Sequence, residues 1–252
     1  MLAEDRLQDL RMTRRTRSFE YVSDDEVMSR IAAEHGLRPE LDIDGPTVHR
    51  VLAQVNQSDL AFLRERGRAI DAEVSVDGRT LRVEARGRRN LGEVTLTYGQ
   101  RLQEASLSAD LATQRTSFAV SGWNPDTKER IQHAAGDSAI RAELNGDTSG
   151  ASILSAAVAD CQEQLVHAAP ITEEEARIVA EANFRRTCRQ FVTGYGLAEG
   201  DGRIRVGSYL KLTGLGPLFN GRYYVEHVRH TFDAVRGYQT WFRVERPGLG
   251  RA

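Results

Sequence analysis

The side chains that could bind a metal are few, and they do not form a complete site. His227 and His230 are the most suggestive pair of ligands. They fall in a segment of alternating polarity that predicts a β-strand, in which residues three apart point to opposite faces. Zinc requires convergent ligands, so we expect these histidines to serve in packing or at an interface. Neither an HExxH nor a GxSxG motif accompanies them.

The acidic clusters do not supply a clear catalytic pair. Glu173 to Glu175 stand at the start of a predicted helix, where carboxylates satisfy free backbone amides and favour the helix dipole. Asp42 and Asp44 are typical of a solvated strand or turn. Paired catalytic carboxylates must face each other across a substrate, and the sequence places neither set in a cleft. We therefore expect a protein without enzymatic activity, cofactor or metal, and keep an accessory cell-wall hydrolase as an alternative.

A basic segment from Arg11 to Arg17 could in principle contact nucleic acid. It lacks interleaved aromatic side chains, and the whole chain carries a formal net charge of −2. We therefore expect no nucleic-acid partner and predict that Arg14, Arg15 and Arg17 lie on a solvated edge or at a subunit interface.

The composition is that of an ordinary soluble globular protein, with 252 residues, 40% hydrophobic and 28% charged. No apolar segment is long enough to cross a bilayer, and residues 1–17 do not resemble a secretory signal. Cys161 and Cys188 are far apart and lack a CxxC spacing. We expect two free thiols in a reducing compartment, hence synthesis in the cytoplasm and no insertion into a membrane.

Two helix signals and one hairpin signal define the first third of the chain. Ser23 and Glu26 have the capping-box spacing at the start of one helix. Ser58 begins a second helix with apolar residues at helical spacing. Asp77 and Gly78 separate two alternating segments, which is a strong hairpin signal. Residues 1–90 are therefore predicted to form a small α+β domain.

From residue 91 onward the apolar residues recur with a period of two, which predicts a sheet or half-barrel. Residues 131–169 are rich in Ala, Gly, Ser and Asp and predict a loop or linker, of which residues 153–165 could be a helix. A long helix is predicted near residues 172–193. Together these patterns predict a β-dominated α+β protein, with a partial β-barrel in residues 91–252.

Three blocks of sequence resemble the phage late control protein D family. They are RMTRRTRSFEYVSDDEVMSRIAAEHGL, VNQSDLAFLRERGRAIDAEVSVDGRTLRV and GPLFNGRYYVEHVRHTFDAVRGYQTWFRVERP. The blocks span nearly the whole chain and keep the order found in the family. The resemblance is to hub proteins of contractile injection systems, akin to VgrG, in which residues 1–90 would be an inserted domain and the remainder a barrel-like hub domain.

This resemblance implies a structural hub subunit of a baseplate that links an inner tube to a spike. The implied partners are a homotrimer in the full-length form, the inner tube protein, the spike protein and other baseplate components. The implied location is a phage-tail-like particle, either a virion or an injection system. Family members usually begin with a further β-domain before the RRTR block, so we expect trimers of a longer form and a spike on a separate chain.

Trp241 is the predicted interface residue at the C-terminal end. Alternation from Tyr238 to Val244 places every second side chain on one strand face and leaves Trp241 on the other. An exposed tryptophan suits a subunit contact. The alternative function is a glycan- or peptidoglycan-binding adaptor of the same machinery, which an aromatic platform on an exposed groove would favour.

Overall fold

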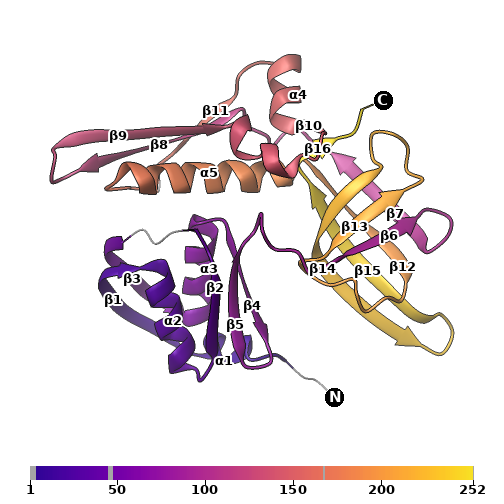
Figure 1. The fold of residues 1–252 in the computed structure, drawn as a ribbon, viewed down its shortest axis with the longest axis horizontal. Coiled ribbons are helices and arrows are strands. Elements are labelled where there is room, and N and C mark those ends of the chain that lie inside the picture. The colour runs from indigo at the N-terminus through magenta and orange to yellow at the C-terminus, as the bar shows by residue number, and fades with distance from the viewer. Residues whose placement is uncertain (1–3, 45–47, 167, 252) are drawn as a thin grey trace.

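The computed structural model describes residues 4–44, 48–166 and 168–251, and these form three parts. Figure 1 shows an N-terminal α+β unit, a curled β-sheet at the opposite end, and the long helix α5 with a β-hairpin on its outer side. Within the described ranges, no helix has the length and apolar character needed to span a bilayer. The fold is β-dominated α+β with a partial β-barrel, as predicted.

The N-terminal unit packs three helices against two small sheets around one apolar core. Strands β1 and β3 form an antiparallel pair, and β5 lies between β2 and β4. Its elements are α1 (Leu7–Met12), β1 (Arg14–Ser23), α2 (Asp24–Glu34), β2 (Arg38–Asp42), β3 (Val48–Ser58), α3 (Asp59–Ala69), β4 (Ala72–Asp77) and β5 (Thr80–Ala85).

The local signals in this unit are confirmed. Glu26 accepts hydrogen bonds from the backbone N–H and the hydroxyl of Ser23, both at 2.9 Å, at the start of α2. The Ser58 hydroxyl accepts from the N–H of Ala61 at the start of α3. Gly78 has φ +58° in the turn between β4 and β5, a conformation that glycine adopts without steric cost. Helices α2 and α3 therefore begin where nearby side chains satisfy their first backbone amides.

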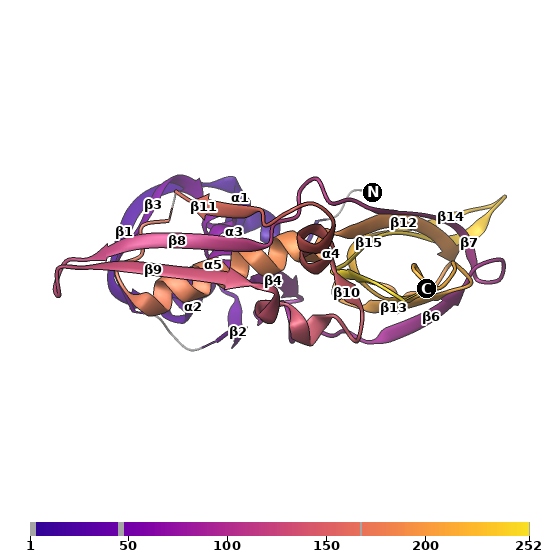
Figure 2. The same cartoon turned by 90° about the horizontal axis from the view of Figure 1, so that it is seen from above.

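Six strands form the partial barrel, and Figure 2 shows them curving around a common interior. Their order is β6-β13-β14-β15-β12-β7, and the tight turn of residues 98–101 joins the two outermost strands. Apolar side chains such as Leu96, Tyr223 and Phe242 fill the interior. The strands are β6 (Glu93–Thr97), β7 (Leu102–Ala109), β12 (Val192–Glu199), β13 (Tyr209–Thr213), β14 (Gly221–Asp233) and β15 (Gly237–Arg246).

The third part is a helix covered by a three-stranded sheet. Ala180 and Phe184 of α5 pack against Phe118 and Val120 of β8, and Figure 2 shows the hairpin β8–β9 running along the helix. The elements are β8 (Ser117–Asn124), β9 (Glu129–Gly136), two short 3-10 turns (Asp137–Ala139 and Arg141–Glu143), β10 (Thr148–Ser149), α4 (Gly150–Ala157), β11 (Gln162–Leu165), α5 (Glu173–Arg189) and β16 (Gly248–Leu249).

The loop or linker predicted for residues 131–169 is wrong in this structure. The described part of that segment contains the end of β9, both 3-10 turns, β10, α4 and β11. Strands β9 and β11 pair with β8, and β10 pairs with β16. Ile131, Ala135 and Leu165 pack in the same apolar cluster as α5, so tertiary contacts decide the extended conformation. Helix α5 corresponds to the helix predicted near residues 172–193. The division into domains at residue 90 stays a prediction.

Candidate functional site

A buried cluster of charges lies where the three parts meet, and we call it the charged junction. It consists of Asp71, Glu73, Arg86, Arg89, Glu143, Arg189, Tyr224 and Glu245.

Arg189, in the last turn of α5, connects two of the parts. Its side chain is only 4% exposed. Its guanidinium lies 2.5 and 2.7 Å from the two carboxylate oxygens of Asp71, which follows α3. It also contacts Glu143 of the second 3-10 turn at 2.6 and 2.8 Å. The guanidinium nitrogens of Arg189 therefore donate to carboxylates of the N-terminal unit and of the second 3-10 turn.

Arg86 connects the N-terminal unit to the barrel. It pairs with Glu245 of β15 at 2.6 Å and with Glu73 of β4 at 3.0 Å. Its guanidinium also lies 3.0 Å from the ring centroid of Tyr224, on β14. The Tyr224 hydroxyl donates to Glu73 at 2.7 Å, and Arg89 pairs with the same carboxylate.

Burial strongly perturbs the acids of this junction. It raises the pKa of Glu245 to about 7, against the opposing effect of Arg86. Burial would also raise the pKa of Glu143, but hydrogen bonds from Arg189 hold it below its ordinary value. Breaking a buried ion pair leaves an uncompensated charge, so such networks are stable only when every member is in place. The charged junction therefore fixes the three parts in one arrangement.

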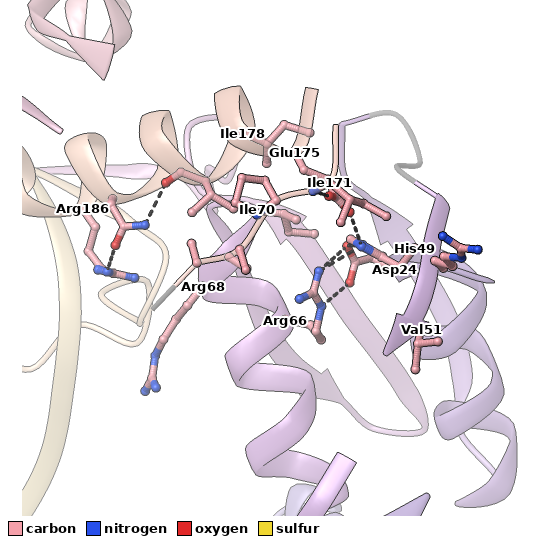
Figure 3. Close-up of a pocket in the computed structure, with 17 residues that line it drawn as sticks. Asp24, His49, Val51, Arg66, Arg68, Ile70, Ile171, Glu175, Ile178 and Arg186 are labelled. Carbon is pink, nitrogen blue, oxygen red and sulfur yellow. Dashed lines mark hydrogen bonds and ion pairs between the residues drawn. The ribbon is translucent and has the colours of Figure 1, made fainter. Parts of the chain in front are cut away.

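A cavity of about 560 Å³ lies between α5 and the N-terminal unit, and we call it the α5 cavity (Figure 3). At one end, His49 of β3 lies between two carboxylates. Its Nε2 is 2.9 Å from Asp24 and its Nδ1 is 2.8 Å from Glu175. Asp24 also forms a bidentate pair with Arg66, at 2.6 and 2.9 Å. Both ring nitrogens of His49 lie beside carboxylates, which favours the imidazolium against the opposing charge of Arg66, whose Nη2 lies 3.1 Å from Nε2.

Charge pairing sets the protonation of this group. Burial alone would lower the pKa of His49, but hydrogen bonds to Asp24 and Glu175 outweigh it and raise the pKa to about 9. Burial would raise the pKa values of both carboxyls, but hydrogen bonds from His49 and, at Asp24, from Arg66 keep them below their ordinary values. Near neutral pH the group is an imidazolium held by two carboxylates.

We expect the stability of the protein to fall as pH rises through about 9. The folded pKa of His49, about 9, lies above the ordinary histidine value of 6.5. Its contribution is thus complete below pH 6.5 and is lost as pH rises through the folded pKa. The shift corresponds to about 3 kcal/mol, which solvent screening of this partly exposed ring reduces to roughly 2 kcal/mol. Denaturant unfolding of wild type and His49→Gln between pH 6 and pH 10 measures this loss. The comparison separates the contribution of His49 from that of Glu245, which is present in both proteins. Parallel curves for the two proteins would contradict the assignment.

The two carboxylates beside His49 are poorly suited to acid catalysis. Glycoside hydrolysis needs one protonated carboxyl and one carboxylate flanking the substrate. Asp24 and Glu175 both have lowered pKa values, and the His49 ring occupies the space between them. In the ranges the structure describes, no group of three or more His, Cys, Asp or Glu side chains is arranged to hold a metal ion.

The predicted strand histidines do not converge. His227 faces outward, edge-on to the ring of Trp241 at 6.2 Å between centroids. His230 faces Thr240 and the carbonyl oxygen of Ile204, at 3.0 and 3.1 Å. Both lie on β14, and the period-two geometry separates them as the sequence predicted.

Trp241 lies on the outer face of β15, opposite the buried Thr240 and Phe242. It stacks beside Tyr195 of β12, with 6.4 Å between ring centroids and an angle of 22° between the rings. Tyr195 is 50% exposed, so the two rings form an aromatic patch on the barrel surface. We call Tyr195, His227 and Trp241 the aromatic patch.

The predicted arginines lie along β1, away from Trp241. Arg14 is exposed and donates to the carbonyl oxygen of Asn56. Arg15 and Arg17 both pair with Glu34, at 3.1 and 2.7 Å, and with the buried Asp59. Their charges are therefore engaged inside the N-terminal unit, and their role at an interface stays a prediction.

Sequence reasoning missed His49, Arg189 and the rest of the charged junction. Arg189 carried only the signal of a basic residue in the last turn of a helix, which the helix dipole explains. Glu175 was explained as a helix cap, and it does accept from the N–H of Ile171. Cys161 and Cys188 are both free, and burial raises the pKa of the Cys188 thiol to about 12.

Residues 2–234 match the family described as the Alg8 N-terminal domain. The chain belongs to this family. A search of curated proteins found no match. The Alg8 N-terminal domain match covers the N-terminal unit, α5 and most of the barrel strands, so the family assignment applies to the arrangement as a whole.

Solved structures place this member of the Alg8 N-terminal domain family among tail proteins by fold. The 43 kDa tail protein of prophage MuSo2 from Shewanella oneidensis has a TM-score of 0.69 at 12% identity, over 96% of this chain and 71% of that one. A tail protein from Neisseria meningitidis MC58 has a TM-score of 0.67 at 8% identity, over 96% and 72%. The c3393 protein of E. coli, described as a type VI secretion component similar to T4 gp27 and gp5, has a TM-score of 0.59 at 11% identity, over 98% and 56%. The fold is therefore tail-hub-like.

Proposed function

We propose that the chain is a structural hub subunit of the baseplate of a phage-tail-like contractile injection system, linking the inner tube to the spike. The observation that carries this proposal is the fold match over 96% of the chain to two tail proteins, one of them from a prophage. The resemblance to the late control protein D and VgrG families supports it. The proposed partners are two further copies in a trimer of the full-length form, the inner tube, the spike and other baseplate components.

The physical properties of the molecule suit a part that transmits force. The barrel has a filled apolar interior, and the charged junction ties it to the N-terminal unit and α5. Buried ion pairs hold one arrangement because any displacement exposes a charge without its partner. We therefore propose that the three parts move as one body when the machine fires.

We propose a role without catalysis. The carboxylates of the α5 cavity are held ionised by His49 and Arg66. Glu245 has a raised pKa, but the cavity beside it is only about 70 Å³, which suits a water molecule or two and no substrate. Neither place combines an acid of suitable pKa with room for a substrate.

The second candidate function is a glycan- or peptidoglycan-binding adaptor of the same machinery. The aromatic patch favours it, because Tyr195 and Trp241 present adjacent rings at the barrel surface. The same rings suit a subunit contact, since Tyr and Trp dominate the energetic centres of protein interfaces. Titration of soluble peptidoglycan fragments into the protein discriminates: saturable binding lost in Trp241→Ala, with assembly unchanged, would favour the adaptor.

We expect Trp241→Ala to weaken trimer formation of the full-length form by at least about tenfold, since a central interface Trp contributes upward of about 2 kcal/mol. Light-scattering chromatography over a concentration series measures this. Trp123, on β8 and 56% exposed, gives the matched control as Trp123→Ala. Monomers of the wild-type full-length form at high concentration would contradict the hub proposal. Equal assembly of Trp241→Ala and wild type would remove Trp241 from the interface.

A further inference from the structure

The middle of the α5 cavity is apolar. In Figure 3, Ile70, just after α3, lies across the space from Ile171 and Ile178, at and near the start of α5. Val179 and Pro170 also line the cavity. β-branched side chains facing one another across an open space leave apolar surface in contact with water, which is unfavourable by about 25 cal/mol per Å². An apolar occupant would remove that cost.

The carboxylates at the His49 end of the cavity are already paired. There His49 and Arg66 face Asp24 and Glu175, and each carboxylate already has a cationic partner at 2.9 Å or less. A ligand carboxylate would be repelled by these two acids, and a ligand cation would have to displace an existing pair. The exposed Arg50 also lines the cavity, but a ligand anion beside His49 would still lie next to two acids, which disfavours this end.

The opposite end carries positive charge without a matching acid. Arg68 of α3 and Arg186 of α5 both lie there in Figure 3. Over the described ranges of the chain, no carboxylate lies within ion-pair distance of either guanidinium, and Arg186 donates only to the Asn183 side chain. Burial and the nearby Arg68 both lower the pKa of Arg186. Asp71, which is paired with Arg189, has the opposite effect. Two cations thus flank the mouth of an apolar space.

We propose that the α5 cavity binds a small amphipathic anion, an apolar chain or ring system that carries one carboxylate. The apolar body lies between Ile70 and Ile178, and the carboxylate lies between Arg68 and Arg186. Guanidinium groups are well suited to carboxylates, which they can bind through two parallel hydrogen bonds. The cavity, about 560 Å³, falls in the range of roughly 300–1,000 Å³ typical of small-ligand sites. This site is independent of the proposed hub role.

Fluorescence titration of the full chain with anilinonaphthalene sulfonate tests the proposal, because that probe combines an apolar ring system with one anion. We expect one saturable site, from which decanoate displaces the probe. Decanol, which lacks the charge, should compete at least about tenfold less well, a difference of about 1.4 kcal/mol. Equal competition by decanol, or the lack of any saturable site, would overturn the proposal.

Variants locate the binding. The double variant Arg68→Gln, Arg186→Gln should weaken decanoate at least about tenfold, and Ile178→Trp should block the apolar space. Arg64→Gln is the matched control, since Arg64 is an exposed α3 residue that does not line the cavity. Unchanged binding in Ile178→Trp would place the probe elsewhere and overturn the assignment. An acetylated leucine tripeptide amide, which carries no anion, would also overturn it by competing better than decanoate.

Discussion

Replacement of Arg189 by methionine is expected to lower the free energy of unfolding by roughly 3–5 kcal/mol. The side chain is 4% exposed and satisfies both oxygens of Asp71 and of Glu143. Methionine fills similar space but leaves Glu143 without an ion pair among the described residues, and leaves Asp71 with only Arg185, at 3.8 Å. Denaturant unfolding at neutral pH, with midpoint and slope compared to wild type, measures the loss.

A matched control for Arg189 exists on the same helix. Arg177 also contacts two carboxylates, Glu174 and Glu181, but its side chain is 43% exposed. Ion pairs in water contribute little, so Arg177→Met should cost less than about 1 kcal/mol. Similar losses of unfolding free energy for the two variants would show that burial does not determine how much these ion pairs stabilise the protein.

A compensated variant separates lost attraction from stranded charge. Adding Asp71→Asn and Glu143→Gln to Arg189→Met removes both uncompensated acids, and this triple variant should regain a large part of the lost stability. If the triple variant were less stable than Arg189→Met, the two carboxylates would stabilise the protein in another way. Uncompensated buried charge would then not be the cause of the loss in Arg189→Met.

Replacement of Gly194 by valine is expected to destabilise the protein by about 3 kcal/mol, the upper part of the range for overpacking. A Cβ atom on Gly194 would overlap the carbonyl oxygen of Ser106 and lie 2.9 Å from the Cα of Leu107. Both belong to β7, so main chain would have to move. Valine favours strands, so strand propensity alone would predict a gain in stability, opposite to the loss expected from the steric overlap.

The effect of Gly194→Val should be local as well as large. Strand β7 pairs with β12 at one margin of the barrel sheet, so its amide protons should exchange faster while those of α2 change less. Gly202→Val is the control: the nearest atom to its added Cβ, the Tyr238 hydroxyl, lies 3.8 Å away. A loss for Gly202→Val equal to that for Gly194→Val would contradict the steric explanation.

Local sequence signals were sufficient for the elements whose stability is mostly their own. Ser23 and Ser58 mark the starts of α2 and α3, and Thr172 marks the start of α5. The turn at Gly78 marks the β4–β5 hairpin. In each case the deciding hydrogen bonds or dihedral angles lie within a few residues of one another, so a single stretch of sequence contains the whole cause.

Local patterns were insufficient where small residues gain their structure from a distant partner. Within residues 131–169, Ala134 and Ala135 belong to β9 because they pair with β8, and the buried Ala135 packs in the apolar cluster that includes α5. Composition alone is compatible with a loop there, since alanine and glycine have weak strand preference. The apolar face of α5, more than the strand's own sequence, selects the extended conformation.

The sequence by itself determined the β-dominated α+β fold, the helix starts, the hairpin and the separation of His227 from His230. Only the tertiary structure decided which charges meet. Arg189 and Asp71 are 118 residues apart, and Arg86 and Glu245 are 159 apart. Periodicity records which side of an element is apolar, because that preference acts within the element. It does not record which acid a buried arginine reaches, because that depends on how the sheets and helices are joined in space.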